Sequence, residues 1–163
     1  MKQDELNTKL LSAAGRGEID KVRSLLDAGA DINVRDSNQQ TPLLRAAAFG
    51  FQSVIIELVY RGADVKVIDE NKQNVLHLAA NSWVSPSTIK LLLSEGADIH
   101  ARDNRNQTPI SIIKGFESIR KDGASEMLDN MGIKEKTGRA RSDASAWSNR
   151  IKQENPKGGG MSL

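Results

Sequence analysis

The sequence predicts an all-α fold, a solenoid of stacked helix pairs separated by short hairpin or loop fingers. The first observation behind this prediction is the triplet Gly-Ala-Asp, which begins at residues 29, 62 and 96 and therefore recurs after 33 and then 34 residues. An apolar pair precedes each triplet, at residues 25–26, 58–59 and 92–93, and a further aspartate follows it, at Asp36, Asp69 and Asp103. A period that so many positions share indicates a repeat architecture.

The first helix of each unit is expected to begin at a second marker, which has the same period and lies at residues 41–44, 74–77 and 108–111. Two of the three copies open with Thr-Pro, the pattern of an N-cap residue followed by a proline in the first turn. Leu43, Ala46 and Ala47 then fall on one helix face. Because alanine is small, this face allows a neighbouring helix to approach closely.

A second helix is expected between the first helix and the triplet. In the N-terminal unit, Ile19, Val22, Leu25 and Leu26 recur at helical spacing, and Gly29 ends the helix where a left-handed conformation is expected. The segment from each triplet to the next marker is short and polar, which is typical of a loop or hairpin finger. Two short helices cannot bury their apolar faces alone, so stability must come from the stacking of units.

With these markers the chain resembles the ankyrin repeat family, whose pattern is Thr-Pro-Leu-His-x-Ala-Ala followed by an apolar Leu-Leu pair and Gly-Ala-Asp. The resemblance covers four units at about residues 4–36, 37–69, 70–103 and 104–133, and so implies an ankyrin repeat domain over residues 1–133. It also implies a function: a non-enzymatic protein–protein interaction module, or scaffold, that binds a protein partner in its concave groove. Such a scaffold serves many partners, so the resemblance indicates how the protein acts and not on what.

Two further functions are compatible with the same resemblance. One is a regulatory, inhibitory or chaperone subunit that masks an enzyme. The other is a secreted bacterial effector that binds a host protein, because such ankyrin proteins often carry an unstructured export tail. The sequence does not separate these alternatives from a general protein-binding module.

Several positions depart from the family pattern. The hairpin glycine expected two residues before each helix marker is replaced by Gln39, Lys72 and Asn106. At least the first two fingers must therefore strain or bend differently. The third unit has one extra residue between its helices, where Ser85-Pro86 predicts a new helix start and leaves Trp83 in a bulged loop. Trp83 either folds back onto the stack or is a second contact point for a partner.

The sequence predicts neither a catalytic site nor a metal site. His77 takes the fourth position of the family marker, where histidine ties a loop by hydrogen bonds, and His100 is also expected to be structural. The recurrent aspartates lie one repeat apart, about 10 Å for stacked helices, which is too far for them to share an ion. No phosphate-binding loop or nucleophile elbow is present, so we expect neither an enzyme nor a bound cofactor.

The composition of the chain indicates in which compartment the protein is expected and which classes of partner it is expected to bind. The chain of 163 residues contains no cysteine, which favours a reducing compartment such as the cytoplasm, or the host cytoplasm for an effector. No run approaches the ~20 apolar residues of a membrane span, so none is expected. We expect a monomer whose partner is a protein and not a nucleic acid.

The C-terminal end is expected to differ from the repeats. The fourth unit lacks the alanine pair, its helices are expected to meet at Asp122-Gly123, and it is interpreted as a degenerate cap. Residues 134–163 carry seven lysines or arginines against three acids and end in a glycine-rich segment, so they are predicted to be a basic, mostly disordered tail. Trp147 in this tail is a secondary candidate for binding a partner.

The candidate binding residues lie on the fingers and on the outward side of the first helices, where side chains hold no core together. They are Arg35, Asn38, Gln40, Arg45, Phe49, Asn71, Lys72, Asn81, Arg105 and Phe116. Phe49 is the most informative, because an exposed aromatic at a variable position is costly unless a partner covers it, or unless Arg45 or Arg16 does. Tyr60, on the second helix of the second unit, is a further secondary candidate together with Trp83.

Overall fold

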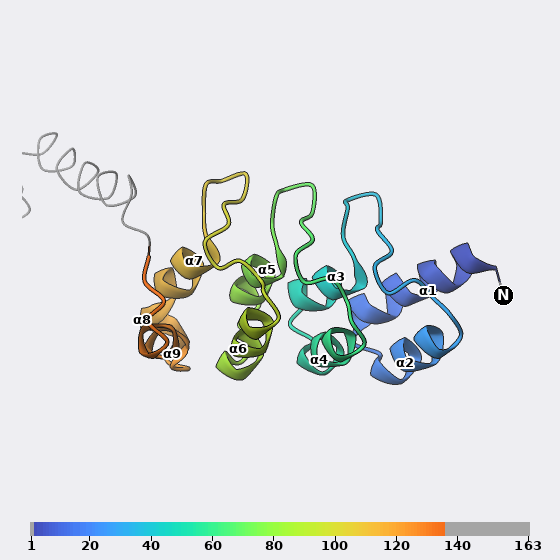
Figure 1. Ribbon diagram of the computed structural model, residues 1–163, viewed down its shortest axis with the longest axis horizontal. Helices are drawn as coiled ribbons and strands as arrows, with labels where there is room; N and C mark the ends of the chain where they lie inside the picture. The colour runs from blue at the N-terminus through green and yellow to red at the C-terminus, as the bar shows by residue number, and fades with distance from the viewer. Residues whose placement is uncertain (1, 136–163) are drawn as a thin grey trace, which may run out of the picture.

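The computed structural model describes residues 2–135, and this part of the chain contains helices and no strands (Figure 1). The helices are α1 (Gln3–Arg16), α2 (Ile19–Asp27), α3 (Pro42–Ala48), α4 (Gln52–Tyr60), α5 (Val75–Asn81), α6 (Pro86–Ser94), α7 (Pro109–Gly115), α8 (Glu117–Arg120) and α9 (Ala124–Asn130). The predicted tail from residue 136 onward, with Trp147, lies outside the described residues.

The helices form two rows. In Figure 1, α1, α3, α5 and α7 follow one another in the upper row, α2, α4, α6 and α9 lie below them, and three fingers project upward from the first row. We call α1–α2, α3–α4, α5–α6 and α7–α9 units one to four. The prediction of an all-α repeat solenoid is confirmed, although the exact ends of the units stay a prediction.

The core runs through the whole stack between the two rows. Leu10, Leu43, Leu76 and Ile110 each come from the first helix of a different unit and are almost completely buried. The alanine pairs of α3 and α5 are also fully buried, as expected for positions where neighbouring helices approach closely. Each unit therefore covers the apolar face of the next, and stability is shared along the stack.

The helix starts follow the predicted capping chemistry. The Thr41 hydroxyl accepts a hydrogen bond from the backbone N–H of Leu44 (3.3 Å), and Pro42 occupies the first turn of α3. Ser85 caps α6 in the same way, accepting from the backbone N–H of Thr88 (3.4 Å), so the predicted new start after the bulge is confirmed. These caps satisfy N–H groups that the first helical turn leaves without a partner.

All three fingers repeat one backbone pattern. In each, the Oδ1 atom of an aspartate accepts two backbone N–H groups from the finger tip, and the residues concerned are Asp36, Asp69 and Asp103. The replacements for the hairpin glycine take a left-handed conformation, with φ of 61° at Gln39, 58° at Lys72 and 62° at Asn106. The predicted strain is confirmed, and it extends to the third finger; the aspartate bonds hold the turn in place.

The two ends of the stack differ from its middle. α1 has 14 residues, whereas α3, α5 and α7 have seven each, so unit one begins with a longer helix. In unit four the one-turn helix α8 precedes the junction predicted at Asp122-Gly123. Lys121 and Gly123 are both left-handed there, and Asp122 accepts from the backbone N–H of Ala124 (3.1 Å), which starts α9.

Candidate protein-binding surface

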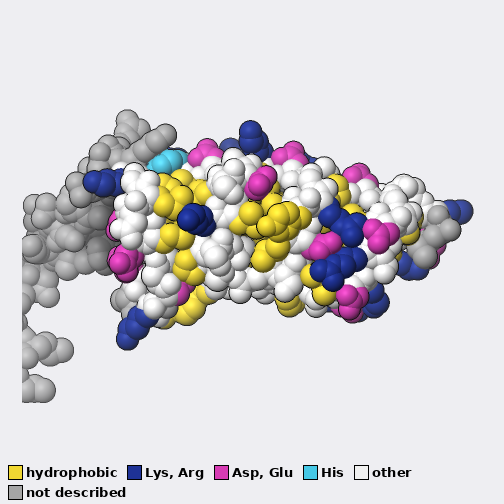
Figure 2. Space-filling model, turned by 60° about the horizontal axis from the view of Figure 1, so that its bottom comes forward, with side chains coloured by type: hydrophobic (Ala, Val, Ile, Leu, Met, Phe, Trp, Pro, Cys, Tyr) yellow, Lys and Arg dark blue, Asp and Glu magenta, His cyan; other side chains and the backbone are white. Residues whose placement is uncertain are grey.

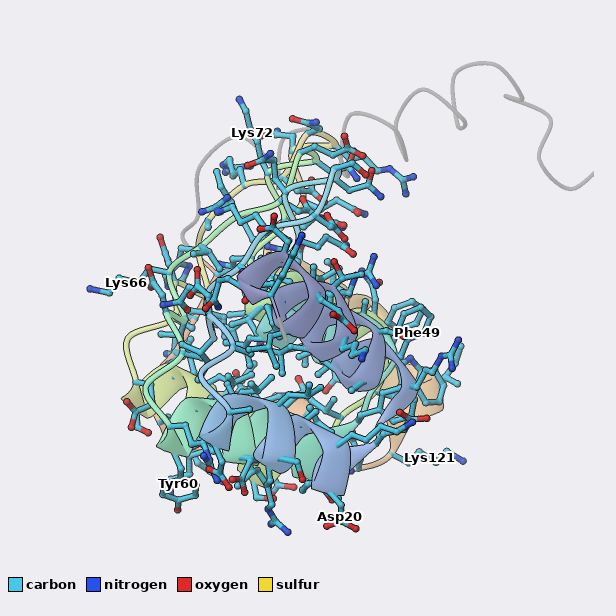
Figure 3. The ribbon with its side chains drawn as sticks, turned by 90° about the vertical axis from the view of Figure 1, so that its right-hand side faces the viewer. Asp20, Phe49, Tyr60, Lys66, Lys72 and Lys121 are labelled. Carbon is cyan, nitrogen blue, oxygen red and sulfur yellow. The ribbon has the colours of Figure 1, made fainter. Side chains whose placement is uncertain are left out.

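The fingers and the first helices enclose a groove. At its unit-one end a hollow of about 420 Å³ lies between α1 and the first finger, and Thr8, Leu11, Val34, Arg35 and Arg45 are among the residues that line it. Figure 3 looks along the stack: Lys72 marks the finger tips at the top, and Phe49 lies at the right, beside the far ends of the first helices. The groove is thus bounded by the finger tips on one side and by the helix turns on the other.

The finger candidates form a connected ridge. The Arg35 guanidinium donates to the carbonyl oxygen of Ile68 in the next finger (3.1 Å). The backbone carbonyl of Asn38 accepts from the N–H of Glu70 (3.1 Å), and that of Asn71 accepts from the N–H of Asn104 (3.0 Å). These contacts between neighbouring fingers fix the ridge before any partner arrives, which lowers the entropy cost of binding.

The side chains at the finger tips are open to solvent. Asn38, Asn71, Lys72 and Arg105 are exposed, whereas Gln40 is half-buried beneath the first tip. Within residues 2–135, neither Lys72 nor Arg105 forms an ion pair. Their charges are therefore free to meet a partner.

Unlike the side chains at the finger tips, the Arg45 side chain is held by other residues of the chain. Its Nε atom donates to Asp36 Oδ2 (2.9 Å), and its Nη2 atom lies 2.8 Å from the same oxygen. Its Nη1 atom also lies 3.5 Å from the carbonyl oxygen of Leu11. The guanidinium thus joins α3 to the first finger and reaches α1, so its charge is already partnered within the chain.

Phe49 remains uncovered although it contacts the adjacent unit. Its side chain is 65% exposed, and its ring lies 6.3 Å from the ring of Phe51, centroid to centroid. A Cβ atom built on Gly15 of α1 would lie 3.9 Å from the Phe49 ring and 3.8 Å from the Arg45 side chain. With 65% of the residue exposed, cover by Arg45 or Arg16, one of the two alternatives that the sequence left open, is at most partial.

Trp83 folds back onto the stack and is also accessible. Its ring centroid lies 5.9 Å from that of Phe116 with an interplanar angle of 54°, yet 46% of the residue is exposed. Phe116 is consequently half-buried rather than open, whereas Asn81, at the end of α5, is exposed. The two readings of Trp83 are therefore not exclusive, because packing on Phe116 leaves part of the indole available.

We call the turns between first and second helices, at residues 16–18, 49–51, 82–85 and 116, the turn edge. Two of its members, Arg16 and Phe51, were not among the candidate binding residues that the sequence indicated, and Arg16 was considered only as cover for Phe49. Arg16 is exposed and forms no ion pair with a described residue. The Phe51 ring is so close to Gly17 that an added Cβ there would lie 2.6 Å from it. A count of aromatic residues at these turns, read from the sequence, could have revealed the edge.

The opposite surface, which α2, α4 and α6 form, has an apolar spot among charges. Tyr60 at the end of α4 is 79% exposed, and Figure 2 shows hydrophobic side chains gathered near the middle of this surface. Next to it, Glu57 accepts from Arg61 (2.7 Å) and from Arg23 of α2 (3.0 Å). Both hydrogen bonds lower the pKa of Glu57, and the bond from Arg61 has the larger effect. The bond from Arg23 joins units one and two.

The two histidines have different surroundings, and the acidic residues form no metal-binding cluster in the described part of the chain. His77 is fully buried; its Nδ1 atom accepts from the backbone N–H of Asn74 (3.1 Å), and its Nε2 atom donates to the carbonyl oxygen of Gln107 (3.0 Å). The prediction that His77 ties a finger is confirmed. His100 is half-buried and lines a hollow of about 280 Å³ with Arg102 and Glu135. Residues 2–135 contain no group of three or more His, Cys, Asp or Glu placed to hold a metal ion.

Comparison with known proteins supports the repeat pattern. A family model described as ankyrin repeats, in three copies, matches residues 10–103, which is more than half of the chain. Among curated proteins, none matches the sequence. No helix within residues 2–135 is both long and apolar enough to cross a membrane.

Proposed function

The chain belongs to the ankyrin repeat family, and we propose from this premise that it binds a protein partner in the groove between its fingers and first helices. Ankyrin repeats are generally protein–protein interaction modules, so the general mode of action follows from the family. The groove as the binding surface, and the absence of catalysis, are our proposals.

Phe49 is the observation that carries this proposal. It is 65% exposed at the end of α3, although the adjacent helix α1 presents a glycine, Gly15, directly opposite its ring. An exposed aromatic on a pre-formed concave surface has the properties of a binding hot spot, because a partner that covers it removes a large apolar area from water. On the fingers, the exposed Arg105 adds the second residue type that is common at hot spots.

The test is affinity capture with two matched variants of the full chain. The wild-type protein, a Phe49→Ala/Arg105→Ala double variant and a Tyr60→Ser variant are immobilised at equal density and exposed to lysate of the source cells. Proteins that the wild type retains are identified by mass spectrometry, and their affinities for all three chains are measured. We expect the double variant to lose about 2 kcal/mol or more of binding free energy and Tyr60→Ser to lose none.

Thermal melting separates binding from folding in this experiment. Neither Phe49 nor Arg105 belongs to the core, so the double variant should melt within a few degrees of the wild type. A double variant that binds normally would refute the groove as the site. If instead Tyr60→Ser abolishes binding, the α2, α4 and α6 surface is the site.

A further inference from the structure

The turn edge contains a tryptophan at a position where the preceding units have glycine. The corresponding residues are Gly17 in unit one, with φ of 72°, and Gly50 in unit two, with φ of 73°. In unit three Trp83 adopts φ of 58° at the same place in the turn. A bulky residue in the left-handed region is strained, and such strain is typically found where the surroundings or a function require that side chain.

The aromatic residues of the chain are concentrated at this edge. The sequence has only three phenylalanines, two tryptophans and one tyrosine. All three phenylalanines and Trp83 belong to the turn edge, so its aromatic character does not reflect a generally aromatic composition. Phe49 and Trp83 stand in neighbouring units, about 10 Å apart by the spacing of stacked helices, and each leaves a large part of its side chain in water.

The acidic and basic side chains of the groove differ in whether they already have a partner within the chain. Its recurrent carboxylates Asp36, Asp69 and Asp103 bind backbone N–H groups in their own fingers, and Asp36 also binds Arg45. Arg16, Lys72 and Arg105, in contrast, are exposed and form no ion pair within the described residues. Two exposed acids oppose them, Glu70 next to Lys72 at the finger tips and Asp4 in the hollow at the unit-one end. The groove and its turn edge therefore present mainly unpaired positive charge beside apolar rings.

We infer that the partner segment is acidic and contains two large apolar side chains. This inference rests on the proposed binding function of the groove. One apolar side chain covers Phe49 and another covers the open part of Trp83 in the next unit. Carboxylates of the segment face Arg16 at the unit-one end, and further residues that cross the groove reach Arg105 on the fingers. From unit one to unit three the edge spans two repeats, about 20 Å, which an extended segment of about six residues covers.

The test uses a library of random 16-residue peptides displayed on phage and selected against the full chain. We expect the selected peptides to share at least two Asp or Glu residues and two residues from among Phe, Trp and Leu at a fixed separation. A synthetic peptide of the shared sequence should bind Phe49→Ala and Trp83→Gly at least tenfold more weakly than the wild type, and Arg16→Glu more weakly still. Tyr60→Ser, which removes the most exposed aromatic side chain of the opposite surface, is the matched control and should bind the peptide unchanged.

Trp83→Gly is the most useful variant because it removes the ring and the strain together. Relief of the strain and loss of the Phe116 contact act in opposite directions, so its melting temperature should stay within a few degrees of the wild type, and a melting curve separates weaker peptide binding from unfolding. If Trp83→Gly fails to fold, Trp83→Ala and Phe49→Ala provide the same comparison.

The outcomes distinguish this inference from the proposed function. Peptides that lose binding in Arg105→Ala or Lys72→Ala, but lack the acidic and apolar pattern or ignore Phe49 and Trp83, overturn the inference and leave the groove as the binding site. Peptides that lose binding only in Tyr60→Ser overturn both. A selection that yields no peptide specific for the wild-type chain also overturns the inference.

Discussion

Units two and three lie in the middle of the stack, whereas unit four lies at one end of it. The two regions bury similar side chains but differ in how many neighbouring units they contact. Unit three has neighbours on both sides and contacts unit four through His77, whose ring reaches the carbonyl oxygen of Gln107. Unit four packs on unit three alone among the described residues, and its exposed surface includes Ile119 (60%) and Met131 (42%). Its buried Ser125 hydroxyl also has no hydrogen-bond partner within the described residues.

The difference shows that the repeat pattern and its stability are separate properties. α9 buries Leu128 as completely as α6 buries Leu92, so the hydrophobic position is retained in unit four. Its support is poorer, because α8 and the left-handed Lys121 interrupt the chain between α7 and α9. In a stack with contacts only between neighbours, such an end unit opens without the rest.

The largest effect is expected from a core deletion in unit three. Leu76→Ala removes a fully buried side chain that is shared by neighbouring units, and it should lower the free energy of unfolding by about 2–4 kcal/mol. Leu128→Ala is the matched change in unit four. It should shift the main transition by less, because α9 is able to open before the stack unfolds.

Urea unfolding followed by circular dichroism measures the main transition, and hydrogen exchange of the α9 amides measures local opening. Leu128→Ala should accelerate exchange in α9 and leave that of α5 unchanged. Equal shifts of the main transition for the two variants would show that unit four unfolds together with the others. A loss below about 0.5 kcal/mol for Leu76→Ala would place this residue outside the inter-repeat core.

Smaller losses of unfolding free energy are expected from changes to His77 in α5 and Ser111 in α7, which each occupy the third position after the N-cap. His77→Ala removes both a capping contact and the bond to Gln107 across to the third finger, leaving buried polar groups unpaired, and should cost about 1–3 kcal/mol. Ser111 caps α7 through Thr108 alone, so Ser111→Ala should cost only about 0.5–1 kcal/mol. Equal losses in thermal or urea unfolding would indicate that the Gln107 bond contributes little.

Glycine substitutions at the finger tips test the strain. Lys72→Gly should stabilise the protein by about 0.5 kcal/mol, because relief of the left-handed conformation exceeds the entropy that glycine adds to the unfolded chain. Asn106→Gly, in the finger of unit four, should gain less, since asparagine tolerates this conformation. The same unfolding experiment measures both variants. Destabilisation by Lys72→Gly would mean that its side chain supports the finger.

The sequence predicted the parts of the fold that depend on local chemistry. Thr41, Ser85 and Gly29 define helix ends through capping and a left-handed backbone, and these effects act within a few residues. The helix α8 was not predicted, since one turn without a cap leaves no periodic signal. Sequence patterns report the period of the chain, and they identify such a short element poorly.

The candidate site was less predictable because it depends on contacts between units. Arg45 had the pattern of an open groove residue, but it is bound to Asp36, nine positions earlier. Phe116 was expected to be open, but Trp83 of the preceding unit stacks on it. Whether a side chain of the turn edge is exposed depends on which side chain of the neighbouring unit lies against it. The repeat period gives the position of each residue and not its orientation.

The smallest expected effect concerns two ion-paired groups, Glu57 and Lys114, that respond at opposite ends of the pH range. Glu57 joins units one and two, and its bonds with Arg61 and Arg23 lower its pKa below the ordinary 4.5. Its contribution to stability is therefore complete above pH 4.5 and is lost as the pH falls through the lowered folded-state pKa. Lys114 joins α7 to α9 within unit four, and its bond with Asp129 (2.8 Å) raises its pKa above the ordinary 10.5, with Glu117 and Glu135 acting in the same direction.

The Lys114 contribution is thus complete below pH 10.5 and is lost as the pH rises through the raised folded-state pKa. Melting curves of the wild type, Glu57→Gln and Lys114→Met at pH 3, 7 and 11 measure both effects. Glu57→Gln should lower the melting temperature at pH 7 and approach the wild type in acid, whereas Lys114→Met should do so in alkali and mainly affect the opening of α9. Both pairs are partly exposed, so each shift should be small and should shrink in high salt. If Lys114→Met shifts the main transition as much as Glu57→Gln does, unit four is as firmly joined to the stack as unit two.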